Sequence, residues 1–375
     1  MLVAGEASGD QHAASLFLEL KKLLPNVRGI GMGGAQMRES GVEIRYDSTP
    51  IAVIGTTEVI KHYGEIRRAL RQMQQLVREE RPDLLICVDY KEFNFRLARA
   101  AKAAGVKVLF YVSPQVWAWR PERVKKYGEV VDQMAVIFPF EVPFYEAHQI
   151  PVRYVGHPLA GTVTPSIPKS LALREFDLQT SGPIIGLLPG SRANEIKRLL
   201  PVIRQSAILL SQRFPNAQFV LSQASSIGAE MLRPHLQECP IDIRVVKGRN
   251  YDVLQCCDAV ITVSGTATLE VALSGIPMAI IYKVTPISYY LGRWLIKIPF
   301  IGLPNILAGR RIVQEFIQHE ATPDNIAGEI GKILGDEAYA GEMRQALREV
   351  KNLLGEGGGS ANLARLATEM LGVVA

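Results

Sequence analysis

Ile184-Ile-Gly-Leu-Leu-Pro-Gly-Ser-Arg-Ala-Asn-Glu-Ile196 is the stretch from which the fold follows. Its apolar run, 184–188, predicts a buried strand, and Pro189 with Gly190 ends that strand in a tight turn. Ser191 can cap a helix that continues from Glu195. A strand that enters a helix through such a turn leaves backbone N–H groups free at the helix start. These groups and the helix dipole favour an anion, most often a phosphate.

A second turn of this kind supports the interpretation of the first as an anion site. Arg192 in the first turn can hold a phosphate through two parallel hydrogen bonds; a solvated arginine in an ordinary turn is the alternative. The second turn, Ser264-Gly-Thr-Ala-Thr268, follows the predicted strand 258–263. Glu270 lies in the first turns of its helix, where a carboxylate either accepts the two hydroxyls of a ribose or is solvated. The residues that together predict a nucleoside diphosphate site are Gly190, Ser191, Arg192, Ser264, Gly265, Thr266 and Glu270.

Strands and helices are predicted to alternate through both halves of the chain, which is typical of the α/β class with doubly wound parallel sheets. A Pro/Ser/Thr-rich stretch, 156–182, is the candidate linker, so we expect one domain over 1–160 and a second over 161–355. A glycine-rich spacer would let a last helix, 361–371, pack back onto the first domain. In the second half the predicted strands are 184–188, 217–222, 242–246, 258–263 and 278–283, and the predicted helices are 195–213, 226–237 and 337–354.

The first half carries two further candidate sites at the carboxyl ends of predicted strands. Asp89 follows the buried run 83–88, and ligands of open α/β sheets bind beyond such strand ends. Asp89 is therefore a candidate general base that takes a proton from an acceptor hydroxyl while Arg192 stabilises the departing diphosphate; a helix cap is the alternative. Ser8 and Gly9 precede a helix predicted from Gln11, whose start can face an anion, unless the glycines only shape the turn.

Two other patterns in the first half are ambiguous. Gly29-Ile-Gly-Met-Gly-Gly34 matches the dinucleotide fingerprint, but we expect no helix after it and find no acidic residue at the right distance, so no dinucleotide site is predicted. Trp117 and Trp119 beside a proline turn indicate either packing or a platform for a sugar.

Composition excludes several classes of protein. Among 375 residues 48% are apolar and 21% are charged, which is typical of a globular enzyme. The four cysteines and six histidines show no metal-ligand spacing, so we expect no metal, and reduced thiols suit a cytoplasmic protein. The net charge of +5 suits an anionic substrate or membrane surface and is too small to indicate nucleic acid. We expect neither a signal peptide nor a membrane span.

Two segments could contact a membrane surface. Residues 57–80 predict a long amphipathic helix, preceded by the apolar residues 51–54. Its basic face is either solvated or a rim that meets anionic lipid. The segment 287–300, which places aromatic and basic residues along an apolar helix, is the second candidate for membrane contact. The alternative for this segment is a helix buried inside the protein. The predicted apolar face of the first helix comprises Val59, Tyr63, Ile66, Leu70, Met73 and Val77, and its basic face Lys61, Arg67, Arg68, Arg71 and Arg78.

Five motifs resemble, in order and over essentially the whole chain, those of the lipid-A-disaccharide synthase family of glycosyltransferases. They are Ala4–Asp10, Tyr111–Trp119, Leu187–Arg192, Ser264–Glu270 and Leu303–Gly309. The resemblance implies the GT-B fold, in which two Rossmann-like domains face each other across a cleft. It implies an inverting hexosyltransferase, without metal or cofactor, that joins UDP-2,3-diacylglucosamine to 2,3-diacylglucosamine 1-phosphate. The products are the β-1,6-linked lipid A disaccharide 1-phosphate and UDP.

The resemblance also implies roles for single residues. Asp89 is the implied base for the acceptor 6-hydroxyl, Arg192 holds the UDP phosphate, Ser8 lies near the acceptor, and Asn305 belongs to the donor site. Glu270 resembles the ribose-binding acid of related GT-B enzymes. After the aspartate the family usually reads Ala/Ser-Pro-Asp-Phe-Asn, whereas this chain reads Tyr90-Lys-Glu-Phe-Asn94. The resemblance therefore does not determine the conformation of the turn at Asp89.

The acylated substrates imply where the enzyme works and which partners it meets. We expect peripheral attachment to the anionic cytoplasmic face of the inner membrane of a Gram-negative bacterium, no nucleic acid, and leave a homodimer open. A UDP-GlcNAc epimerase, the peptidoglycan GlcNAc transferase and a non-catalytic sugar-nucleotide-binding module are the alternative functions.

Overall fold

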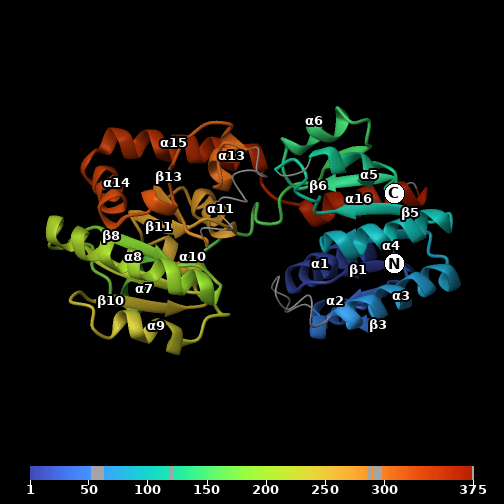
Figure 1. Cartoon of the computed structure of the whole chain (residues 1–375), viewed down its shortest axis with the longest axis horizontal. Helices are drawn as coiled ribbons and strands as arrows, with labels where there is room; N and C mark the ends of the chain where they lie inside the picture. Colours follow the sequence, from blue (N-terminus) through green and yellow to red (C-terminus); the bar gives the residue numbers. More distant parts are fainter. Residues whose placement is uncertain (52–62, 119–120, 286–288, 290–297, 374–375) are drawn as a thin grey trace. The chain divides into compact units, whose positions relative to one another are not determined.

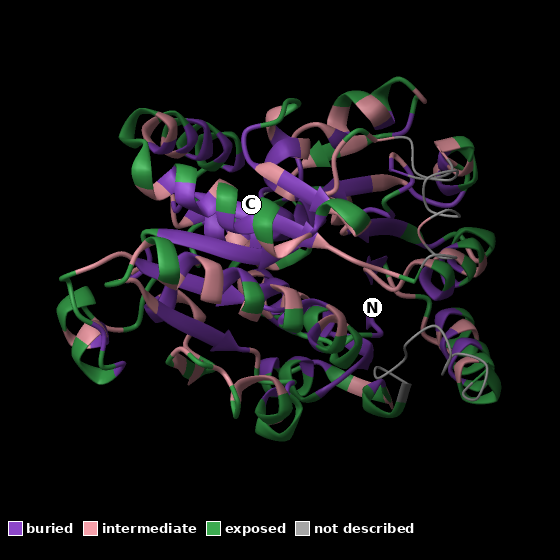
Figure 2. Ribbon diagram, turned by 60° about the vertical axis from the view of Figure 1, so that its left-hand side comes forward, coloured by how far each residue is buried: buried purple, intermediate pink, exposed green. Residues whose placement is uncertain are grey.

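The computed structural model describes residues 1–51, 63–118, 121–285, 289 and 298–373. The chain forms two compact units, each with one parallel sheet covered by helices (Figure 1). Unit 1 comprises Met1–Ala160 and Glu356–Ala375, and unit 2 comprises Gly161–Gly355. Figure 2 shows the strands as mostly buried and the helices as exposed on their outward faces. The expected class, two doubly wound parallel sheets, is therefore confirmed.

The sheet of unit 1 has seven parallel strands in the order β3-β2-β1-β4-β5-β6-β7. The order reverses between β1 and β4, where Val3 pairs with Cys87, so the loops after these two strands diverge at their carboxyl ends. Every residue of β1, β2 and β4 is buried, as expected for strands covered on both faces. The strands are β1 (Leu2–Ala4), β2 (Ile30–Gly33), β3 (Glu43–Asp47), β4 (Leu84–Val88), β5 (Lys107–Tyr111), β6 (Gln133–Val136) and β7 (Val152–Tyr154).

Helices cover both faces of this sheet over two separate cores. The core on one face includes Met73 and Leu97, and the core on the other includes Phe17 and Leu363. The helix α16 thus returns from the end of the chain to pack beside α1, and Asn362 donates to the carbonyl of Val155 at 3.0 Å. The helices are α1 (Ala7–Leu23), α2 (Ala35–Ser40), α3 (Tyr63–Glu80), α4 (Lys91–Ala103), α5 (Val124–Gly128), α6 (Glu141–Glu146) and α16 (Gly359–Leu371).

The sheet of unit 2 has six parallel strands in the order β10-β9-β8-β11-β12-β13, with the reversal between β8 and β11. The strands are β8 (Ile184–Leu188), β9 (Gln218–Gln223), β10 (Ile243–Lys247), β11 (Ala259–Val263), β12 (Met278–Tyr282) and β13 (Gln314–Ile317). The helices are α7 (Lys169–Glu175), α8 (Ala193–Arg213), α9 (Ala229–Leu236), α10 (Asn250–Leu254), α11 (Thr266–Leu273), α13 (Leu303–Ala308), α14 (Pro323–Gly335) and α15 (Glu337–Leu354).

The structure differs from the sequence-based expectations in several places. A helix, α2, does follow the glycine pattern 29–34, and α1 begins at Ala7 rather than Gln11, so Ser8 and Gly9 lie inside its first turn. The expected linker contains a helix of its own, α7. Tyr63 was assigned to the apolar face of its helix, but it is 54% exposed because it stands on the first turn, ahead of the buried stripe that starts at Ala69.

Parts of both candidate membrane segments, 52–62 and most of 287–297, lie outside the described residues, as does Trp119. Within the described part of the chain, no helix is both long and apolar enough to cross a membrane.

Candidate functional site

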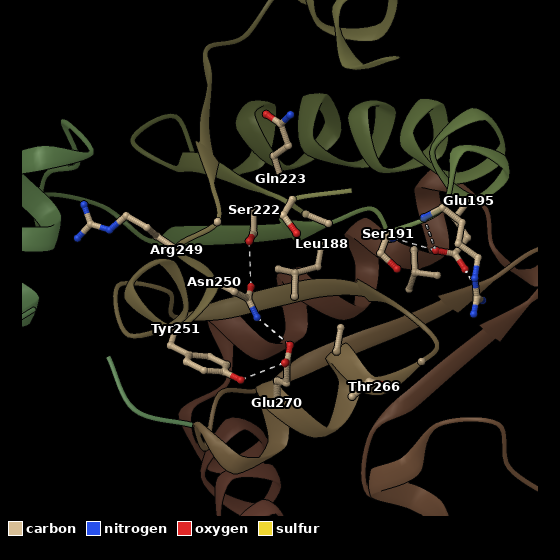
Figure 3. Close-up of a pocket in the computed structure, with 18 of the residues that line it drawn as sticks. Leu188, Ser191, Glu195, Ser222, Gln223, Arg249, Asn250, Tyr251, Thr266 and Glu270 are labelled. Atoms are coloured by element: carbon tan, nitrogen blue, oxygen red, sulfur yellow. Dashed lines mark hydrogen bonds and ion pairs between the residues drawn. The ribbon is translucent and has the colours of Figure 1, made fainter. Parts of the chain in front are cut away.

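A cavity of about 640 Å³ opens at the carboxyl ends of β8, β9, β10 and β11 in unit 2 (Figure 3). Its volume lies in the range of small-molecule sites. The order β10-β9-β8-β11 places the loops after these four strands side by side. The structure brings together in this cavity seven residues singled out from the sequence, namely Gly190, Ser191, Arg192, Ser264, Gly265, Thr266 and Glu270.

The turn after β8 differs from expectation because its backbone N–H groups already have an acceptor. The carboxylate of Glu195 accepts from the amides of Ser191 at 2.9 Å and Arg192 at 3.2 Å (Figure 3). It also accepts from the guanidinium of Arg192 at 3.2 Å. Arg192 is the N-cap of α8 and Glu195 its third residue, so the Glu195 carboxylate closes the first turn of the helix, as the glutamate of a capping box does. The Arg192 side chain is 82% exposed and can move toward a ligand.

Glu270 is held by two donors from the first turn of α10, the helix after β10, so it is not a solvated helix residue. Asn250 Nδ2 donates to one oxygen at 2.8 Å, and the hydroxyl of Tyr251 donates to the other at 3.1 Å (Figure 3). Ser222 in turn donates to Oδ1 of Asn250 at 2.9 Å. Burial raises the pKa of the Glu270 carboxyl, and the two hydrogen bonds partly offset that rise. Each oxygen keeps a lone pair for a hydroxyl of a ligand.

Sequence reasoning missed Ser222, Asn250 and Tyr251. These residues form no motif, and only the strand order brings their loops next to Glu270. The usable signal was their place at or shortly after the ends of predicted strands, where ligands of α/β sheets bind.

Asn305 does not line the cavity. Its side chain is fully buried, its Nδ2 donates to Val313 and Glu315, and its Oδ1 accepts from the amides of Ile312 and Val313. Because every polar atom of the side chain is used inside the unit, its contribution is to connect α13 with β13.

Asp89 in unit 1 lies at the carboxyl end of β4 and is half-buried. It does not cap the next helix, since the N-cap of α4 is Tyr90 and no side chain caps it. Asp89 and Tyr90 both have positive φ, 48° and 46°. A non-glycine residue in this region costs on the order of 1–3 kcal/mol, and such residues gather at functional sites. Lys91, where the family usually has proline, begins α4.

The charge of Asp89 acts on His12, which in turn acts on His157; the sequence did not single out either histidine. The half-buried His12 packs its ring edge-on against Tyr111, with ring centroids 6.2 Å apart. Burial lowers the pKa of His12, and the charge of Asp89 raises it by a smaller amount. Burial lowers the pKa of His157 to about 4, with a further contribution from His12. The exposed Ser8 lies on the first turn of α1, after the neighbouring strand β1.

The backbone amides at the start of α2 already bind a carboxylate of the protein. The carboxylate of Asp10 accepts from the amides of Gly34 at 2.6 Å, Gln36 at 3.0 Å and Met37 at 3.3 Å. The place where a dinucleotide phosphate would lie after the glycine pattern 29–34 therefore holds a carboxylate.

Trp117 is a packing residue. Its indole nitrogen donates to the buried carboxylate of Glu141 at 3.1 Å, and its ring meets Phe140 edge-on. The same carboxylate accepts from Ser113 and from the amide of Phe138, so it fixes the loop after β5. Of the two alternatives for this tryptophan, the structure supports packing.

Metal ligands do not gather in the described part of the chain, where no group of three or more His, Cys, Asp or Glu residues could hold a metal ion.

The chain is similar to known proteins over its whole length. A family model described as lipid-A-disaccharide synthetase matches residues 1–364. A lipid-A-disaccharide synthase of Geobacter sulfurreducens is 52% identical over 99% of this chain and 97% of its own, and one of Coxiella burnetii is 39% identical over 99% and 98%. Among solved structures, UDP-GlcNAc 2-epimerase from Neisseria meningitidis bound to UDP-GlcNAc aligns with a TM-score of 0.64 at 13% identity over 98% of both chains. The glycotransferase of kitacinnamycin aligns with a TM-score of 0.64 at 16% identity over the same shares.

Proposed function

The chain belongs to the lipid-A-disaccharide synthase family, and from that premise we propose that it joins UDP-2,3-diacylglucosamine to 2,3-diacylglucosamine 1-phosphate. The protein is thus a glycosyltransferase of lipid A disaccharide synthesis with a UDP-sugar donor and a sugar acceptor. The products are the β-1,6-linked disaccharide 1-phosphate and UDP. The observation that carries the donor part of this proposal is the cavity of unit 2, where Arg192 and Glu270 line one space.

The donor nucleotide is assigned to this cavity by the chemistry of its lining. The ribose hydroxyls donate to the carboxylate of Glu270, whose orientation Asn250 and Tyr251 fix. The diphosphate accepts hydrogen bonds from the exposed guanidinium of Arg192 and from the N-terminal end of α11 at Gly265 and Thr266. These groups stabilise the negative charge that grows on the leaving UDP in the transition state.

Asp89 is the general base in this proposal. It takes the proton of the acceptor 6-hydroxyl, whose oxygen then forms the bond to the sugar carbon as the bond to UDP breaks. One base without a nucleophile–base pair suits direct displacement, with inversion at that carbon. A positioned base contributes on the order of 10²–10⁴-fold. Ser8, exposed on the first turn of α1 after the neighbouring strand β1, is assigned to the acceptor.

The reaction is proposed to need neither a metal nor a cofactor. Arg192 and the helix start at Thr266 supply the positive charge and N–H groups that a diphosphate leaving group requires. Activity that survives dialysis against EDTA supports this part; activity restored only by a divalent cation contradicts it.

The acylated substrates place the enzyme, in this proposal, on an anionic membrane surface at the cytoplasmic face. Arg67, Arg68, Arg71 and Arg78 of α3 are all exposed, opposite the buried Met73 and Val77. Basic side chains of this kind attract anionic headgroups by about 1 kcal/mol each near the surface. Cosedimentation with anionic vesicles that weakens as salt rises supports the electrostatic attachment, whereas salt-independent binding or none contradicts it.

The deciding experiment is a mixed-micelle assay with the two diacylglucosamine substrates in which UDP release is followed. Stoichiometric UDP and disaccharide 1-phosphate support the proposal. Turnover of UDP-GlcNAc without an acceptor indicates an epimerase instead. A protein that binds UDP but releases none in the presence of both substrates is a binding module.

A further inference from the structure

The backbone that carries Asp89 is strained over two consecutive residues. Asp89 and Tyr90 have φ of 48° and 46°, and Tyr90 has ψ of 57°, so both are left-handed. Neither residue is glycine, and an aromatic residue rarely takes this conformation. Such a turn persists only where the surrounding structure determines it.

The side chain of Asn94 grips the peptide groups on both sides of Asp89. Its Nδ2 donates to the carbonyl of Asp89 at 2.7 Å and lies 3.3 Å from the carbonyl of Val88. The first carbonyl belongs to the peptide after Asp89 and the second to the peptide before it. Fixing both peptide planes fixes φ and ψ of Asp89 and therefore the direction in which its side chain leaves the backbone. The Asp89 amide donates to the carbonyl of Tyr111 at 3.0 Å, which ties the turn to β5.

The two halves of the Asn94 side-chain amide are used differently. Asn94 is fully buried, and its Oδ1 has no hydrogen-bond partner among the described residues. A buried acceptor without a donor is costly, and most buried polar atoms in proteins are paired. The benefit of an asparagine here therefore lies in the donating half, which points at the strained turn.

Gly5 holds the turn from the other side. A Cβ at this position would overlap the ring of Tyr90, so the absence of a side chain lets that ring lie close to the backbone that follows β1. The ring also packs against Phe93, with centroids 5.2 Å apart. Tyr90 is thereby anchored by contacts from two elements, while Asn94 holds the backbone beside it.

We propose that Asn94 is a positioning residue, which with Gly5 holds the strained Asp89-Tyr90 turn so that Asp89 presents its carboxylate to the acceptor hydroxyl. This inference rests on the proposed function, because it assumes that Asp89 is the base. Asn94 touches no substrate and acts through the backbone of Asp89. Its loss is expected to lower kcat and to leave UDP binding, a property of unit 2, unchanged.

The test compares kcat, KM and the UDP dissociation constant in four variants. Asn94→Ala removes the donor, and Asn94→Asp keeps the size but puts an acceptor against two carbonyls. Both are expected to lower kcat on the order of 10²-fold, since a base displaced by about 1 Å loses that much, with UDP affinity within twofold of the parent. Asn362→Ala is the matched control, because it removes an amide–carbonyl hydrogen bond in unit 1 away from the turn. It should keep kcat.

A fourth variant separates positioning from stability. Glycine adopts the left-handed region freely, so adding Tyr90→Gly to Asn94→Ala should restore kcat at least fivefold, even though it removes packing and lowers the melting temperature. A purely structural role predicts the opposite, a further loss. Unchanged kcat in Asn94→Ala, or a loss explained by its unfolded fraction, overturns the inference. Asp89→Asn distinguishes the two failures: if it keeps turnover, the proposed base itself is wrong.

Discussion

Replacing Tyr251 with phenylalanine removes a single hydroxyl from the cavity of unit 2 and is expected to weaken UDP binding about tenfold. That hydroxyl donates to Glu270 at 3.1 Å, while Asn250 holds the other oxygen at 2.8 Å. This bond is present with and without UDP, so its removal weakens binding by letting the Glu270 carboxylate leave the position in which it meets the ribose. The energy of a hydrogen bond to a charged group, about 1.5–3 kcal/mol, bounds that effect. Because Glu270 is half-buried and keeps its second donor, we take the low end, and 1.4 kcal/mol corresponds to tenfold in affinity.

The assay is calorimetric titration with UDP and with 2′-deoxy-UDP. If Glu270 accepts both ribose hydroxyls, 2′-deoxy-UDP makes only one of the two hydrogen bonds to it. Tyr251→Phe should then lower the affinity for 2′-deoxy-UDP by a smaller factor than the affinity for UDP. Tyr339→Phe is the matched control: its hydroxyl donates to Glu329 at 2.7 Å in the same unit but outside the cavity. Equal losses for the two ligands, or an unchanged UDP affinity in Glu270→Ala, would refute the ribose assignment.

Three further predictions follow from the described contacts. Arg192→Ala should weaken UDP binding about tenfold by calorimetry, since a charge-assisted phosphate contact is lost, with little change in stability because the side chain is exposed. Gly190→Ala should lower the melting temperature and UDP affinity together, because φ is 109° and the added Cβ would overlap the Glu195 carboxylate. Burial lowers the pKa of His157 from 6.5 to about 4. Between pH 6.5 and pH 4 the unfolded chain therefore binds more protons than the folded chain. The free energy of unfolding should fall by about 3 kcal/mol as the pH drops through this range. Urea unfolding at several pH values measures this, and His157→Asn, which keeps an acceptor for the Leu159 amide, should flatten the dependence.

The elements that the sequence predicted well are those with a strong local pattern. The strand 184–188 and the helix 337–354 were predicted with their observed ends, since an apolar run before Pro189 and a long amphipathic period are visible without tertiary context. The helix α2 was missed because six residues after Gly34 are too few to show a helical period. Asn305 was assigned to the donor site from its motif, whereas its burial depends on β13, which no local pattern indicated.

The candidate site was only partly visible in the sequence for the same reason. The turns after β8 and β11 carry glycines and hydroxyls in a recognisable order. The partners of Glu270 belong to α10, the helix after β10, which lies near α11 only because of the strand order of the sheet. The conformation of Asp89 was also beyond prediction, because nothing in Asp-Tyr favours two left-handed residues in succession; the contacts with Asn94 and Gly5 impose it.

The amides at the starts of α2, α8 and α11, three helices that follow glycine-containing turns, are used differently. Those of α2 bind the carboxylate of Asp10, and those before α8 bind the carboxylate of Glu195. At the start of α11, no carboxylate in the described residues accepts from the amides of Gly265 or Thr266, and both residues face the cavity. A free helix start attracts an anion, whereas one that a fixed carboxylate occupies repels it. The donor diphosphate should therefore depend on the amides of α11 together with Arg192, and less on the amides of the turn after β8.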